Sequence, residues 1–192
     1  MTTTKKLVIA VVALSLALLC TIGGTLAFLV AKSNTVTNTF TYGKIELKVW
    51  EDKKTNETGK TYTNVVPGDV LAKDPVVTVT EGSEECYVYV LIDNQLGNAA
   101  SYNIANTWIE VGKRGTKVLY RYNTVVDART SAQDLAVFTT LTFVNTLTKD
   151  DVPDLGEKKV VISAYAHQSD NTTEELADDA AIKWAEVDYT LA

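Results

Sequence analysis

The stretch that decides the fold is residues 86–92, which read Cys-Tyr-Val-Tyr-Val-Leu-Ile. A short run of apolar, β-branched and aromatic residues is typical of a strand that is covered on both faces. We therefore expect 86–92 to form the central strand of a sheet. Cys86 is expected to be buried and inert, because a thiol in apolar surroundings seldom ionises.

Strand and turn patterns flank this run. Residues 45–49 alternate apolar with charged side chains, which predicts a strand with one face in water. Val66-Pro67-Gly68-Asp69 predicts a type II turn, since proline suits its second position and glycine its third. Further strands are expected at 36–42, 76–80, 108–111 (ended by Gly112), 117–122, 135–144 and 160–166, with a loop at 93–106. Such short strands predict a mostly β protein, a sandwich of jelly-roll or Greek-key type.

One amphipathic helix is expected near the C-terminus. Asn171 or Thr172 can cap it, and acidic Glu174 and Glu175 suit its first turn. Its apolar stripe is expected to contain Leu176, Ala180, Trp184, Val187 and Leu191. We expect this stripe to pack the helix onto a sheet.

The first 27 residues have the pattern of a signal peptide. Lys5 and Lys6 precede an apolar run from Leu7 to Leu19, and small residues follow at the positions that a signal peptidase reads. We expect cleavage between Ala27 and Phe28, which leaves one secreted domain over 28–192. The alternative is a membrane anchor, because the apolar stretch can be extended to about 24 residues.

The charge balance bears on partners. The formal net charge is −6. A nucleic-acid partner requires a basic face, so an acidic chain argues against one. It also argues against docking on an anionic lipid surface, and membrane contact is expected only through the uncleaved signal segment.

Residues suited to catalysis are few. His167 is the single histidine, and a zinc site of the His-Glu-x-x-His kind cannot be built from one histidine. Calcium binding by Asp150, Asp151 and Asp154 is a weak possibility, because oxygen-rich turns suit that ion. We expect neither a catalytic site nor a cofactor.

The segment 28–42 suggests assembly. Val36, Asn38, Phe40 and Tyr42 alternate with threonines, which is a strand pattern that follows directly on the expected cleavage site. A free strand of this kind can add to the edge of a neighbouring sheet, and head-to-tail addition propagates into a filament. Alternatively, the strand folds into its own sheet, and the residues leave both open.

Several short motifs together resemble the TasA/camelysin family of Gram-positive bacteria. The chain carries them, in order, as Gly23-Gly24-Thr25-Leu26-Ala27-Phe28, Asn38-Thr39-Phe40, Gly43-Lys44-Ile45-Glu46-Leu47, Pro67-Gly68-Asp69 with Lys73-Asp74, and Ala164-Tyr165-Ala166 with Gln168. The resemblance implies a jelly-roll protein that a dedicated signal peptidase releases. It further implies a subunit of matrix or surface fibres that joins itself or related subunits by donating its N-terminal strand.

Two other functions are kept as alternatives. One is a monomeric binding module for carbohydrate or a host ligand, in which Trp108 and Tyr102 are the residues to watch, although a core position for Trp108 is favoured. The other is a metalloprotease around His167, an activity also attached to the family. The missing zinc motif argues against it.

Overall fold

The structure is a computed structural model that describes residues 3, 5, 43–51, 54, 55, 57, 59–148 and 158–190. The chain divides into two compact units, Met1–Thr41 and Tyr42–Ala192. The expected signal peptide, its cleavage site, the 28–42 segment and the acidic turn at 150–154 lie outside the described residues, apart from helical Thr3 and Lys5. No helix among the described residues is both long enough and apolar enough to cross a membrane.

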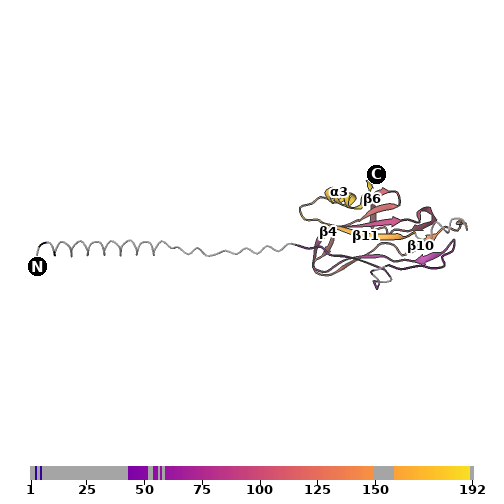
Figure 1. The fold of residues 1–192 in the computed structure, drawn as a ribbon, viewed down its shortest axis with the longest axis horizontal. Helices are drawn as coiled ribbons and strands as arrows, with labels where there is room; N and C mark the ends of the chain where they lie inside the picture. Colours follow the sequence, from indigo (N-terminus) through magenta and orange to yellow (C-terminus); the bar gives the residue numbers. More distant parts are fainter. Residues whose placement is uncertain are drawn as a thin grey trace. The chain divides into compact units, whose positions relative to one another are not determined.

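The long strand β4 (Ser83–Asn94) is the centre of the larger sheet (Figure 1). It pairs with β11 (Val160–Gln168) along one edge, and with β7 (Lys117–Tyr122) and β8 (Val126–Ala128) along the other. Beyond β7 lie β6 (Trp108–Arg114) and the short β12 (Asp188–Tyr189). The expectation of a central strand at 86–92 is confirmed.

A second layer faces this sheet. It contains β1 (Leu47–Trp50), β3 (Val76–Val79) and β9 (Gln133–Ala136) in that order, and β2 (Val70–Ala72), β10 (Thr140–Phe143) and β5 (Ala100–Tyr102) in the order β2-β10-β5. A 3₁₀ turn, η1 (Gly97–Ala99), precedes β5. The two groups of strands are continuous, because the amide of Val137 donates to Pro75 O and that of Lys73 donates to Thr139 O. Every strand pair in the described part is antiparallel.

The main core lies between the two layers. Val77 and Val79 of β3 meet Val88, Val90 and Ile92 of β4, and all five are 0% exposed. Burying such side chains contributes about 1.5–3 kcal/mol each, so this contact contributes substantially to the stability of the sandwich. A mostly β protein with one helix in its described C-terminal part is therefore confirmed.

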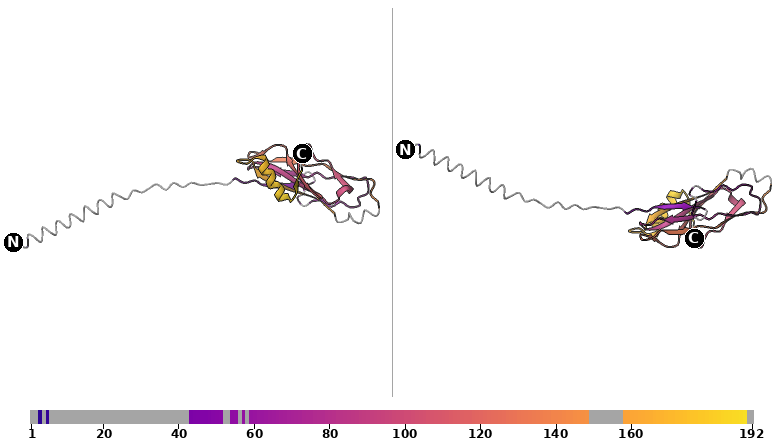
Figure 2. Two further views of the ribbon diagram at one scale, coloured as in Figure 1. Left: turned by 90° about the horizontal axis from the view of Figure 1, so that it is seen from above. Right: turned by 90° about the horizontal axis from the view of Figure 1, so that it is seen from below.

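Helix α3 (Glu174–Ala185) covers the outer face of the larger sheet (Figure 2). Its cap is Thr173, whose hydroxyl accepts from the amide of Leu176, and not the predicted Asn171 or Thr172. The predicted stripe is partly wrong, because Leu176 is 57% exposed, although Trp184 stacks on Tyr165 of β11 with ring centroids 5.2 Å apart and Val187 is buried. The helix buries Ala177, Ala181, Ile182 and Ala185, and Val187 lies beyond its end.

Three other predicted boundaries are corrected. The strand at 108–111 continues through Gly112 to Arg114, with a bulge between Glu110 and Gly112. The stretch 135–144 is split between β9 and β10, and the predicted loop 93–106 contains η1 and β5. The turn at 66–69 is confirmed, with Gly68 at φ 86° and a 3.1 Å hydrogen bond from Asp69 N to Val66 O.

The bulge gives a test of the fold. A methyl group on Gly112 would lie 2.6 Å from the carbonyl oxygen of Asp188, and this backbone cannot move without disturbing β12. Gly112→Ala should therefore lower the free energy of unfolding by about 1–3 kcal/mol in urea titration. Gly43→Ala is the matched control, because its methyl would meet only the flexible side chain of Glu84, at 2.5 Å. Equal losses in the two variants would contradict this account.

Candidate functional site

The candidate site is the outer edge of β11. This strand of nine residues pairs with β4 in unbroken register, from Val160 opposite Asn94 to Gln168 opposite Cys86. Among the described residues, no strand pairs with its other edge. One side of β11 is therefore available to a strand from elsewhere.

The hydrogen-bond pattern identifies which backbone groups point outward. Ser169 N donates to Glu85 O, and Gln95 N donates to Lys159 O, both at 3.0 Å. Directly opposite residues alternate between bonded and unbonded pairs in an antiparallel ladder, so the odd-numbered residues of β11 bond to β4. The outward N–H and C=O groups belong to Val160, Ile162, Ala164, Ala166 and Gln168.

The same residues leave the core incompletely covered. Ile162, Ala164 and Ala166 point into the main core, where they are only partly buried. Their partners on β4 are 0% exposed. The difference arises because β11 has a neighbour on one side only and because alanine covers little surface. An added strand with larger inward side chains would bury this apolar surface.

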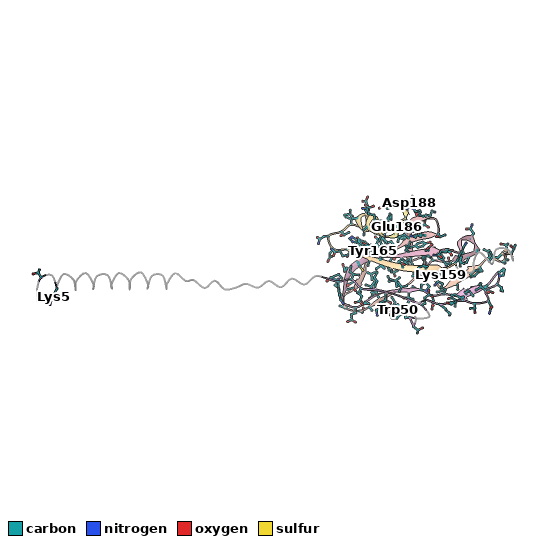
Figure 3. All side chains as sticks on the ribbon, viewed as in Figure 1. Lys5, Trp50, Lys159, Tyr165, Glu186 and Asp188 are labelled. Atoms are coloured by element: carbon teal, nitrogen blue, oxygen red, sulfur yellow. The ribbon has the colours of Figure 1, made fainter. Side chains whose placement is uncertain are left out.

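A second edge without a partner among the described strands lies near the first. Thr80 N donates to Glu46 O at 3.0 Å, so the outward backbone groups of β1 are those of Leu47 and Val49, whose side chains also enter the core only partly buried. The Cα atoms of β1 and β11 approach to within 8 Å, although no ladder joins the strands. Trp50 at the end of β1 and Lys159 before β11 are labelled in Figure 3. We call the region between the two edges the seam.

The width of the seam limits what can enter it. Neighbouring strands lie about 4.8 Å apart, so a strand between two edges needs about 9.6 Å. β1 must therefore move away from β11 to admit another strand. It is a short strand of four residues that is paired only to β3 among the described strands, but its movement would also disturb the core contacts of Leu47 and Val49.

Two other edges of the described part are protected. β6 carries a bulge between Glu110 and Gly112, and β12 covers its outer edge at Gly112 and Lys113, held in place by a 2.8 Å ion pair between Arg114 and Asp188. β9 has four residues and carries Asp134, which Lys54 contacts at 2.8 Å. Bulges, short edges and charges are the usual protection against unwanted pairing. The unbroken β11 contains neither proline nor lysine.

A polar cluster beneath α3 has a structural role. Arg121 of β7 pairs with Asp178 at 2.5 Å and with Glu174 at 2.6 Å, and the Tyr89 hydroxyl donates to Asp178 at 2.8 Å. Burial, followed by this hydrogen bond, raises the pKa of Tyr89 far above its usual value, so the hydroxyl remains a donor. These bonds fix the helix to the sheet.

The Pro-Gly-Asp and Lys-Asp motifs also have structural contacts. Asp69 accepts a 2.9 Å hydrogen bond from the amide of Val66 and so closes its own turn. Lys73 forms an ion pair with Glu51, and each residue is 7% exposed. The pair joins the end of β1 to the connection between β2 and β3. Losing either partner would leave a buried charge uncompensated.

The residues predicted for the alternative functions occupy core or strand-end positions. Trp108 is 5% exposed, and its indole N–H donates to Ala136 O, so it is a core residue. Tyr102 stacks on Phe138 with ring centroids 5.0 Å apart. His167 lies near the end of β11, with Nδ1 3.0 Å from Gln168 O. Within the described ranges, no three His, Cys, Asp or Glu side chains form a potential metal site.

Sequence reasoning found β11 but missed its edge. Ile162, Ala164 and Ala166 belong to a predicted strand, yet periodicity shows only which side chains share a face. Comparisons with protein-family models, curated proteins and solved structures found no match to the chain.

Cys86 provides a test of the core beneath the site. Burial raises the pKa of its thiol to about 11. At pH 8 the thiolate fraction is then about one part in a thousand, and the side chain is also 0% exposed. We expect the chain 28–192 to resist Ellman's reagent when native and to react with one equivalent in denaturant. Rapid labelling of the native protein would contradict the described packing.

Proposed function

We propose that this protein is a secreted structural subunit of an extracellular matrix or surface fibre, assembled by donation of its N-terminal strand. In this proposal the sandwich is a jelly roll of the TasA/camelysin kind. The observation that carries the proposal is the edge of β11, which combines outward backbone groups with partly buried core residues. A donated strand would bond to these backbone groups and would bury these core residues.

The proposed donor is the segment 28–42. Its alternation places Val36, Asn38, Phe40 and Tyr42 on one face and threonines on the other. Ala164 and Ala166 on the acceptor edge are small and only partly buried, so aromatic side chains of a donor would cover them once β1 has moved. Main-chain hydrogen bonds supply affinity in such strand addition, and the alternating side chains supply specificity.

Release from the membrane controls when the donor becomes available. A dedicated signal peptidase would cut between Ala27 and Phe28, and the donor strand begins at the new N-terminus. Before cleavage the segment is tethered beside the membrane, and after cleavage it can reach another subunit. The partners are therefore other copies of this chain or related matrix subunits, at the cell surface or in the matrix.

A monomeric binding module is the second candidate. Trp108 and Tyr102 were the residues first considered for ligand binding in such a module. This candidate is weakened because Trp108 is buried and Tyr102 is stacked on Phe138. No contact in the described part favours it, so it serves as an outcome of the following test.

Proline substitution tests the acceptor edge. The N–H of Ala164 points away from β4, so Ala164→Pro removes an outward donor while it keeps the ladder to β4. The lost hydrogen bond alone should weaken association by about 1 kcal/mol, about fivefold, and the ring adds a steric block. We expect the chain 28–192 to form filaments in negative-stain microscopy and Ala164→Pro to form few or none.

Glu110→Pro is the matched control. Asn123 N donates to Thr107 O at 2.9 Å, which places the Glu110 amide on the outer edge of β6, at the opposite side of the same sheet. Filaments should survive this change and should be lost when residues 28–42 are deleted. If all these chains remain monodisperse, a binding module becomes the better account. If Ala164→Pro assembles like the unaltered chain, β11 is not the acceptor.

A further inference from the structure

The two ends of the sandwich can be distinguished by hydrogen bonds to the start of β4. Lys44 O accepts from Glu84 N at 3.1 Å, and Ser169 N donates to Glu85 O at 3.0 Å. The first described residues of the domain and the last residues of β11 therefore meet at one end, which we call the entry end. The beginning of β11 lies at the other end, which we call the far end, where Val160 is opposite Asn94.

These positions set the strand directions. β4 runs from the entry end to the far end, and antiparallel β11 runs back from the far end to the entry end. β1 begins at the entry end, because Glu46 pairs with Thr80 beside the turn between β3 and β4. The segment 28–42 joins the domain at the entry end, directly before Gly43.

The direction in which the segment runs along β11 then depends on whether it pairs with its own chain or with a neighbouring copy. If the segment folded onto its own β11, it would have to finish at the entry end, and it would run parallel to β11. In head-to-tail assembly, the entry end of one subunit faces the far end of the next. The donated segment would then enter the neighbour with residue 42 nearest the far end, and it would run antiparallel to the neighbour's β11.

The length of the segment suits this arrangement. The 15 residues from 28 to 42 extend over about 50 Å, whereas the nine residues of β11 span about 30 Å. The segment is therefore long enough to cover the whole acceptor strand. Within the seam the donated segment would run antiparallel to β11 and parallel to β1, which begins at the entry end.

We infer that the donated segment pairs antiparallel with β11 of a second copy, with the Phe40 face toward the seam and the Thr41 face toward Tyr165 and the side of the sheet that α3 covers. This inference rests on the proposed function and adds the direction and facing of the donor. Thr41 then lies near Val161 at the start of the neighbour's β11. It lies far from His167 at the other end of that strand.

Pairs of introduced cysteines test the direction of the donated segment directly. The side chains of Val161 and His167 belong to odd-numbered residues, which form unbonded pairs with an added antiparallel strand. Such pairs bring opposite Cβ atoms close enough for a disulfide. We would prepare the chain 28–192 as Thr41→Cys with Val161→Cys, and as Thr41→Cys with His167→Cys. Thr41→Cys alone is the control, and buried Cys86 is present in all three.

The expected result is a ladder of disulfide-linked oligomers on non-reducing gels for the pair 41 and 161, and little cross-linking for the pair 41 and 167. A ladder from 41 and 167 instead would overturn the polarity but keep donation. A disulfide-linked monomer from 41 and 167 would show self-pairing and overturn the proposed function as well. Filaments without a ladder from either pair would show that the donor does not lie on β11 in this direction, which also overturns the inference.

Discussion

Backbone hydrogen bonding along β4 is the interaction on which the described domain depends. Its twelve residues bond to β11 on one edge and to β7 and β8 on the other, so this strand sets the register of the larger sheet. Its side chains also contribute to the cores on both faces of the larger sheet. Val88, Val90 and Ile92 enter the main core, and Tyr89 meets the helix. An antiparallel sheet of this kind still has two outer edges, whose backbone groups need other partners.

The two outer edges of the larger sheet differ in how they are covered. At one side β12 pairs with β6, and Thr190 N also donates to Val111 O at 3.1 Å, so β6 is covered over residues 111–113. At the other side β11 is long, regular and without charged or proline residues. It carries small alanines where a covered strand would carry larger side chains. This asymmetry is what a head-to-tail assembly requires, because each subunit must offer an acceptor that differs from its donor.

Part of this architecture could be predicted from the sequence. The apolar run 86–92 and the alternation at 45–49 correctly located β4 and most of β1, because periodicity reports which residues share a face. The helix face was partly misassigned, since the close approach of α3 to the sheet favours Ala177 and Ala181 over the larger Leu176. Strand order is set by tertiary contacts, so no pattern in residues 160–168 predicts that this strand lies at the edge of a sheet. The donor segment 28–42 was predicted from sequence alone.

Amide hydrogen exchange across β11 is the most direct test of the central claim, that this edge is open in the monomer and filled in the fibre. In monomeric chain 28–192, the amides of Ile162, Ala164 and Ala166 should exchange quickly, while those of Val161, Ser163 and Tyr165, which bond to β4, should be protected. In filaments the first three should become protected as well. Equal protection of both sets in the monomer, or an unchanged alternation in filaments, would contradict the account.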